Sequence, residues 1–316
     1  MMVLSLAACG SQAPANTTPT GYTYKVAIVQ QLDHSSLDEI RLAVTAQLEA
    51  LAAEKGIGIL IEDFNGQNDG SVLNQIGTQV VDDGFDMIIP IATTAAQCMV
   101  TAADGTDIPI VYAAISDPET AGLTGIPTVT GVSDALNTPF ILDMMLSAQP
   151  DIRSVGLLYS LSEPNSVTPI KEAKAYLDAK GIAYIEKTGN TADEVITAAS
   201  ALVGRCDAVF TPTDNAIMNV APSVAEILTG AGIAHYAGAD SFVQSGSFAT
   251  CGVNYTELGT YTATMAMDIL LGGAMPEFHV MDGGIITVNT STADALGIDY
   301  SAFNSMANTI NAITID

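Results

Sequence analysis

The sequence predicts an α/β protein made of two doubly wound lobes, each a parallel sheet with helices on both faces. Its 316 residues are enough for two domains of about 150 residues each. The apolar residues come in runs of about five to eight, which is typical of buried parallel strands. Amphipathic helical stretches alternate with these runs, as they do in parallel sheets with helical crossovers.

The first half of the chain follows this alternation from residue 24 onward. Strands are predicted at 24–29, 58–64, 85–92, 108–115 and 128–133, and helices at 36–54, 69–83 and 93–103. The first helix has apolar residues at helical spacing and ends at Lys55-Gly56, a C-terminal helix signal. The Pro-, Gly- and Asn-containing segment 127–139 is expected to lead the chain into the second lobe.

The second half repeats the rhythm with strands at 154–160, 183–187, 208–211, 233–237, 248–253 and near 285–288, and helices at 166–180, 192–203, 216–229 and 257–271. Short helices are expected near the end. The strand at 248–253 is surplus to the second half and could return to the first sheet. Two α/β lobes joined by several crossings predict hinged lobes with a cleft between them.

The first 21 residues are excluded from the predicted fold. Leu6-Ala7-Ala8-Cys9 resembles a bacterial lipobox, in which small residues precede a cysteine that is lipidated and becomes the new N-terminus. The Gly-, Pro- and Thr-containing run to residue 20 resembles a flexible tether. Only eight residues precede Cys9 and none is basic, so the signal is shorter than a complete secretory signal. We expect an extracytoplasmic domain held to the membrane by a lipid on Cys9.

Charge and cysteine content exclude several classes of function. Nine Lys and Arg stand against 35 Asp and Glu, a formal charge of −26, so the chain cannot form the basic footprint of a nucleic-acid binder. The four cysteines show no zinc-binding spacing, and no Gly-rich phosphate loop occurs, so neither metal nor cofactor is expected. A Cys206–Cys251 bridge is left open.

Ligands of parallel α/β sheets bind beyond the carboxyl ends of the strands, and this rule selects the candidate site. The ligand-binding candidates are Gln31, Asp33, Thr93, Thr94, Ala95, Ser116 and Asp117 in the first half, and Tyr159, Asn165, Ser166, Asp214, Asn215 and Asp240 in the second. Hydroxyls, amides and carboxylates dominate this set and cations are almost absent, so a phosphorylated ligand is disfavoured.

The same residue types favour a zwitterion. Main-chain N–H groups at the helix start Thr93-Thr94-Ala95 suit one carboxylate, while Asp117, Asp214 and Asp240 suit an ammonium group. The alternative for each position is an ordinary helix N-cap. The run Asp33-His34-Ser35-Ser36 is not a triad, because a triad is assembled by the fold rather than by consecutive residues. No enzyme is predicted.

Several motifs occur together in one known family, in this order: Gln30-Gln31-Leu32-Asp33-His34, Ala92-Thr93-Thr94-Ala95-Ala96-Gln97, Tyr112 through Asp117-Pro118, Val129 through Asp134, Asn165-Ser166, Pro212-Thr213-Asp214-Asn215 and Tyr255-x-x-Leu258-Gly259. From about residue 24 to 298 the chain resembles ABC-transporter substrate-binding lipoproteins of the group that takes up tryptophan and other aromatic amino acids. The family commonly has Pro-Gly-Gly where this chain has Thr124-Gly125-Ile126-Pro127.

The resemblance implies a periplasmic-binding-protein type I fold with three inter-lobe crossings, near 134–138, 250–253 and 282–286. The lobes would be 22–135 plus 251–283, and 136–250 plus 284–316. It also implies binding of an amino acid, above all an aromatic one, without catalysis or cofactor, and delivery to an ABC permease and its ATPase. A sugar or nucleoside binder on the same fold, and a sensor that presents its ligand to a membrane receptor, remain as alternatives.

Overall fold

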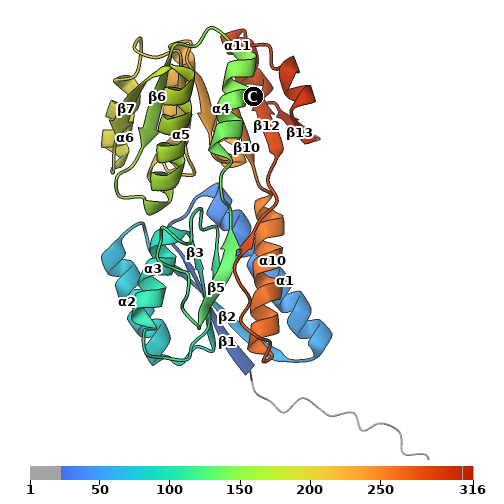
Figure 1. Cartoon of the computed structure of the whole chain (residues 1–316). Helices are drawn as coiled ribbons and strands as arrows, with labels where there is room; N and C mark the ends of the chain where they lie inside the picture. The colour runs from blue at the N-terminus through green and yellow to red at the C-terminus, as the bar shows by residue number, and fades with distance from the viewer. Residues whose placement is uncertain (1–22, 308, 316) are drawn as a thin grey trace, which may run out of the picture.

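The computed structural model describes residues 23–307 and 309–315. It consists of two α/β lobes stacked end to end, each built on its own sheet (Figure 1). The predicted lipid anchor at Cys9 and the tether behind it lie outside the described residues. Within those residues, no helix combines the length and the apolar character needed to cross a bilayer.

The first lobe is a parallel sheet in the order β11-β5-β4-β3-β1-β2. Its strands are β1 (Thr23–Gln30), β2 (Gly58–Asn65), β3 (Met87–Ile91), β4 (Ile110–Ala113), β5 (Val129–Ser133) and β11 (His279–Val280). Helices α1 (Ser35–Lys55) and α10 (Tyr255–Leu270) pack together on one face, and α2 (Gly70–Asp82) and α3 (Thr93–Ala102) on the other (Figure 1).

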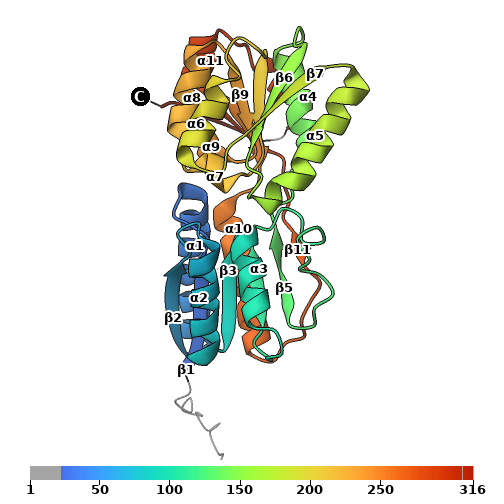
Figure 2. The same cartoon turned by 90° about the vertical axis from the view of Figure 1, so that its left-hand side faces the viewer.

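The second lobe is a sheet in the order β13-β12-β10-β9-β8-β6-β7, parallel except between β10 and β12. Its strands are β6 (Ser154–Tyr159), β7 (Ala183–Thr188), β8 (Ala208–Thr211), β9 (Ala234–Ala237), β10 (Ala249–Gly252), β12 (Ile285–Asn289) and β13 (Thr309–Ile313). Helices α4 (Thr138–Ala148) and α5 (Val167–Lys180) cover one face, and α6 (Ala192–Ser200) and α8 (Ala221–Gly230) the other (Figure 2).

Shorter helices complete the second lobe: α7 (Asn215–Met218), α9 (Asp240–Gln244), α11 (Thr290–Leu296), and the 3₁₀ turns η1 (Pro164–Ser166) and η2 (Ser301–Ser305). The helix predicted at 216–229 is therefore two helices, and α8 begins anew with Pro222 in its first turn, where proline is tolerated. Neither α4 nor β13 is predicted from the sequence.

The placement of β10 decides a point that the sequence left open. A return of this strand to the first sheet was one possibility, but Ala249 and Thr250 pair with Tyr236 and Ala237 of β9 in the second sheet. The short helix α9 is the reason, because it returns the chain directly beside β9. The chain enters the first lobe only afterwards, where α10 begins, so the predicted lobe boundary at residue 251 falls inside β10.

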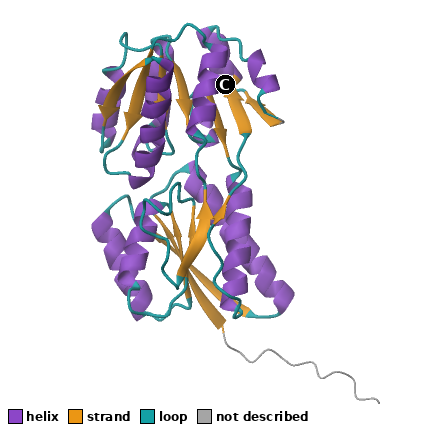
Figure 3. Cartoon of the chain, in the orientation of Figure 1, coloured by secondary structure: helices purple, strands orange, loops and turns teal. Residues whose placement is uncertain are grey.

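Three segments carry the chain between the lobes. They join β5 to α4, β10 to α10, and β11 to β12, and all three pass the same side of the molecule (Figure 3). Two peptide segments enter the second lobe and one leaves it, so the lobes are connected as a hinge rather than through a single linker. The two-lobe fold expected from the sequence is confirmed.

The local signals of α1 show how the elements follow from the sequence. Ile40, Val44 and Leu48 are fully buried, and each such side chain contributes about 2 kcal/mol relative to an exposed one. The helix ends at Gly56, whose φ of 65° is the left-handed conformation that glycine adopts without strain. The amino end of α1 and the turn before it lie at the edge of the sheet that faces the second lobe.

Gly131 provides a test of how tightly the first sheet is packed. It pairs with Tyr112, and a Cβ at this position would lie 2.2 Å from the Tyr112 carbonyl oxygen and 2.3 Å from its ring. We expect Gly131→Ala to lower the free energy of unfolding by about 1–3 kcal/mol, because overpacking shifts the neighbouring strand. Urea unfolding measures this change. Gly70→Ala is the matched control, since a Cβ there meets nothing within 4 Å; equal unfolding midpoints for the two variants would contradict the prediction.

Candidate ligand-binding site

A cavity of about 380 Å³, including its solvent-open mouth, lies between the lobes where the strands of both sheets end. The first lobe and the adjoining hinge contribute His34, Ser36, Leu37, Ala92, Thr93, Ala114, Ser116, Asp134 and Tyr255. The second lobe contributes Asn165, Thr213, Asp214, Asn215, Met218, Ala239, Ser241 and Phe242.

Direct hydrogen bonds between side chains of the two lobes hold the cavity closed. They join Gln31 Nε2 to Glu163 Oε1 (3.0 Å), His34 Nε2 to Asn215 Oδ1 (2.9 Å), Ser36 Oγ to Ser241 Oγ (2.5 Å), Ser116 Oγ to Thr213 Oγ1 (3.1 Å) and Thr168 Oγ1 to Asp117 Oδ2 (2.6 Å). Such contacts require the two sheet edges to approach each other. The lobes are therefore in a closed arrangement.

Three buried polar atoms at the cavity have no partner in the protein. They are Thr93 Oγ1 and His34 Nδ1 from the first lobe and Asn165 Oδ1 from the second. Buried polar side chains in native proteins are nearly always hydrogen-bonded, because an unpaired one costs about 1–3 kcal/mol. These atoms indicate where a bound molecule finds its polar contacts.

Asp214 is a fully buried carboxylate at the cavity. It is the N-cap of α7: its Oδ1 accepts from the Ile217 N–H at 3.0 Å, and its Oδ2 accepts from the Ser160 N–H and the Ser166 hydroxyl, both at 2.7 Å. Burial raises the pKa of Asp214, and these hydrogen bonds oppose the shift. The Ala216 N–H also favours the ionised form, so this buried negative charge is stabilised by hydrogen bonds alone.

A second buried carboxylate, Asp134, follows β5 and also lines the cavity. It accepts hydrogen bonds from Ser116 Oγ at 3.0 Å and from the Tyr255 hydroxyl at 3.3 Å. Burial raises the pKa of Asp134. No Lys or Arg of the described residues lines the cavity, so both carboxylates face it without a protein cation.

The amino end of α3 reaches the same cavity. Ala92, the residue before the helix, has φ of 76°, and Ala114 on the next strand has φ of 56°. Positive φ values at residues other than glycine cost about 1–3 kcal/mol and collect at functional sites. The Thr94 N–H donates to Gln31 Oε1 at 3.2 Å, whereas the first-turn N–H groups of Thr93 and Ala95 have no intrahelical acceptor.

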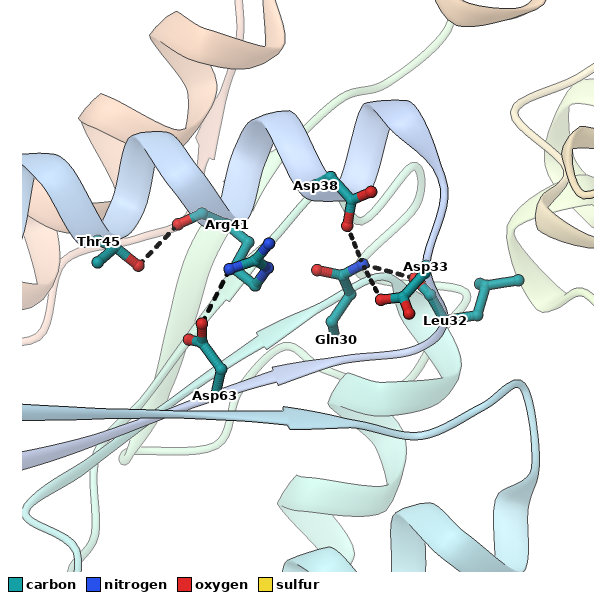
Figure 4. A network of polar contacts seen from close by, with 7 residues as sticks. All are labelled: Gln30, Leu32, Asp33, Asp38, Arg41, Thr45 and Asp63. Carbon is teal, nitrogen blue, oxygen red and sulfur yellow. Dashed lines mark hydrogen bonds and ion pairs between the residues drawn. The ribbon is translucent and has the colours of Figure 1, made fainter.

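The turn after β1 is held by the side chain of Gln30. Its Nε2 donates to Leu32 O at 2.7 Å, to Asp38 Oδ1 at 2.8 Å and to Asp33 Oδ1 at 3.4 Å (Figure 4). Gln30 is buried at the end of β1, so these bonds fix the path of the backbone into α1. This turn positions Gln31 and His34 at the inter-lobe edge.

The structure brings most of the predicted site residues together. Thr93, Ser116, Asn165, Asp214 and Asn215 line the cavity. Gln31, Thr94 and Ser166 lie behind it and hold the lining residues in place, and Asp117 joins the lobes through Thr168.

Three predicted residues lie elsewhere, and each is a correction. The Tyr159 hydroxyl donates to Glu186 at 2.7 Å on the neighbouring strand, because side chains of β6 alternate across the sheet. Ala95 is not among them: its side chain packs in the core of the first lobe, but the prediction concerns its main-chain N–H, which lies in the first turn of α3. Asp33 is exposed beside Gln30, and Asp240 accepts from Gln244 on its own helix at 3.3 Å.

Sequence reasoning missed several residues of the site: His34, Ser36, Glu163, Met218, Ser241, Phe242, and the roles of Asp134 and Tyr255. Asp134 and Tyr255 belong to motifs noted in the sequence, which was an available signal. Met218, Ser241 and Phe242 lie on the short helices α7 and α9, which the sequence did not delimit. The Cys206–Cys251 bridge left open is not formed, since Cys98, Cys206 and Cys251 are all free.

A family model described as "ABC transporter substrate binding protein" matches residues 25–307. The chain belongs to the ABC transporter substrate-binding protein family. The resemblance noted in the sequence is therefore confirmed. A curated relative, the tyrosine-binding protein of Clostridioides difficile, is 32% identical over 278 residues, which cover 86% of this chain and 80% of that protein.

Solved structures agree with the fold. The ABC domain in complex with L-Trp from Streptococcus pneumoniae has 28% identity and a TM-score of 0.84, covering 92% of this chain and 100% of that one. The ligand-free, open structure of a substrate-binding protein with adhesive properties from Clostridium difficile has 31% identity but a TM-score of 0.69, covering 93% and 100%. The lower score despite the higher identity agrees with a closed arrangement of the lobes here.

The closed arrangement can be captured chemically. Because Ser36 Oγ and Ser241 Oγ are 2.5 Å apart across the cleft, cysteines at both positions bring their sulfur atoms near the 2.05 Å of a disulfide. We expect the Ser36→Cys/Ser241→Cys variant to form an intramolecular cross-link on mild oxidation, detected as a loss of two hydrogens by mass spectrometry. The single variants are the controls. A double variant that keeps both thiols free would show that the lobes do not close in this register.

Proposed function

We propose that this protein is the extracytoplasmic binding component of an ABC importer, and that it captures an aromatic amino acid as its zwitterion between the lobes. One observation carries the proposal: the cavity joins two buried carboxylates without a protein cation to three buried polar atoms without a partner. A molecule with one ammonium group and one carboxylate supplies a cation for Asp214, donors for Asn165 Oδ1 and an acceptor for the Thr93 hydroxyl. The protein acts by binding and release, not by catalysis.

The ammonium group is assigned to Asp214 and Asn165. Asp214 supplies a buried negative charge, and the unpartnered Asn165 Oδ1 is a free acceptor on the same lobe. Ammonium groups donate three hydrogen bonds, so two acceptors fixed in the second lobe define its orientation. In a site closed to water this charge pair is stronger than at the surface, and a ligand without an ammonium leaves Asp214 uncompensated.

The ligand carboxylate is assigned to the amino end of α3. The unpartnered Thr93 hydroxyl and the first-turn N–H groups are hydrogen-bond donors, and the helix dipole favours negative charge there. These donors belong to the first lobe, whereas the acceptors for the ammonium belong to the second. Binding of both groups of one ligand therefore draws the lobes together.

The ligand side chain is assigned to the apolar part of the cavity, where Leu37, Met218 and Phe242 lie. Burial of an aromatic ring contributes about 2–3 kcal/mol, and methionine adapts to irregular ring shapes. The relatives described as binding tyrosine and L-Trp support an aromatic side chain. A lipid on Cys9 would hold the protein at the outer face of the membrane, next to the permease and the ATPase that receive the ligand.

A thermal-shift screen tests the ligand class. We expect L-tyrosine and L-tryptophan at about 1 mM to raise the melting temperature by several degrees, because a ligand that binds only the folded state stabilises it by mass action. Sugars and nucleosides lack an ammonium group and should give no shift. A shift with a sugar or nucleoside, and none with an amino acid, would contradict the proposal.

Calorimetry of Asp214→Asn tests the assignment of the ammonium group. We expect the affinity for L-tyrosine or L-tryptophan to fall at least about tenfold, or about 1.4 kcal/mol, because the variant removes the charge and keeps the shape. Asp240→Asn is the matched control, since this carboxylate lies outside the cavity. A loss of affinity only in Asp240→Asn would instead place the ligand's ammonium group near Asp240, on α9.

A further inference from the structure

Glu163 joins the two lobes behind the ligand cavity. This residue precedes η1, is 2% exposed and does not line the cavity itself. Its Oε1 accepts from Gln31 Nε2 of the first lobe at 3.0 Å, and its Oε2 accepts from Asn215 Nδ2 of the second at 2.8 Å. One buried carboxylate thus holds an amide from each side of the cleft.

Both amides connect onward to the site. Gln31 Oε1 accepts from the Thr94 N–H at the start of α3, and its Nε2 also donates to Asn68 Oδ1 at 2.9 Å. Asn215 Oδ1 contacts His34 Nε2 at 2.9 Å. Glu163 therefore positions groups at the two parts of the cavity assigned to the ligand, and it does so only while the lobes are closed.

Closure places Glu163 in an environment that favours its neutral form. Burial, and next the negative charge of Asp214, raise the pKa of Glu163 from 4.5 to about 8. Four donors favour the ionised form of Asp214, against three for Glu163, so Glu163 is the member of this pair that carries the proton. The O–H of neutral Glu163 donates to Asn215 Oδ1 after the Asn215 amide flips, and His34 then accepts at Nε2 with its proton on Nδ1. The titratable groups that face it are Asp214 and, through Asn215, His34.

We propose that Glu163 is a positioning residue that latches the two lobes and takes up one proton as they close on the ligand. This inference rests on the proposed function, because it concerns the same site. When the lobes separate, Gln31 leaves with the first lobe and water reaches Glu163, which then ionises as an ordinary carboxyl group.

The direction of the pH effect follows from the two protonation states. The pKa of Glu163 is higher in the closed form, so closure takes up a proton between about pH 4.5 and pH 8, and affinity falls as the pH rises through this window. His34 acts oppositely, because burial lowers its pKa from 6.5 and closure then releases a proton below that pH. From pH 6.5 to about pH 8 the imidazole changes the affinity by at most about twofold, so the larger change in this range reports on the carboxyl group.

Calorimetry of L-tyrosine or L-tryptophan binding at about pH 6.5 and about pH 8 tests the latch. We expect wild-type affinity to be roughly tenfold weaker at the higher pH, with proton uptake near pH 7 measured from buffers of different ionisation enthalpy. Glu163→Gln should bind within a few-fold of wild type at the lower pH, without the fall at the higher pH and without proton uptake; the remaining change, from His34, should be at most about twofold in the opposite direction.

The Glu163→Gln variant can keep the network because the neighbouring groups adapt. The new side-chain amide would offer its oxygen to Gln31 and its nitrogen to Asn215, whose own amide flips. His34 then accepts at Nε2 by moving its proton to the unpartnered Nδ1. Glu163→Ala cannot make these bonds, so its affinity should be lower at both pH values.

Two results would overturn the latch: wild-type affinity that is the same at both pH values, or proton uptake that persists in Glu163→Gln. Absence of heat with any aromatic amino acid at either pH would instead contradict the proposed function. In that case the radius of gyration of the unliganded wild type, measured by small-angle scattering, tests the latch independently of ligand binding. An equal radius of gyration at the two pH values would then reject it, and a smaller radius at the lower pH that is absent in Glu163→Gln would support it.

Discussion

The carboxyl ends of two parallel sheets face each other across one cleft, and the site depends on this arrangement. Polar side chains that follow the strands of either sheet would lie at a solvent-exposed edge if the lobe stood alone. The three hinge segments bring the two edges together, and hydrogen bonds such as those from Ser36 and Thr168 become possible. Burial then changes the chemistry of the same residues, because Asp214 and Glu163 lose water without gaining a cation.

The residues at the cleft fall into two groups: those that stabilise the closed arrangement by themselves, and those that need a ligand. The direct contacts between lobes favour the closed arrangement. The unpartnered atoms of Thr93, His34 and Asn165, together with the carboxylates of Asp134 and Asp214, favour it only when a ligand supplies their partners. The proposed zwitterion supplies partners for Thr93, Asn165 and Asp214 without disturbing the direct contacts between the lobes, so a ligand without an ammonium group is disfavoured.

Much of the fold could be predicted from the sequence, because strands such as β1 and helices such as α1 carry strong local signals. The rule that ligands bind beyond the carboxyl ends of parallel strands also selected five residues that line the cavity: Thr93, Ser116, Asn165, Asp214 and Asn215. Local pattern could not place β10, because its sheet depends on the five-residue helix α9 before it. It could not show that Tyr159 turns toward Glu186, since that choice depends on strand pleat and on the neighbouring strand.

Glu163 was beyond sequence reasoning for a different reason. No sequence signal near Pro164 marks Glu163, and its importance comes from Gln31, a residue 132 positions earlier in the chain.

The polar lining of the cleft also has a consequence for energy use in the membrane. An importer that responds to closed carriers hydrolyses ATP without cargo whenever a carrier closes on nothing. The groups that bind the ligand make such closure unfavourable, because they would be buried without partners. In the proposed importer, this lining would limit ATP hydrolysis without cargo.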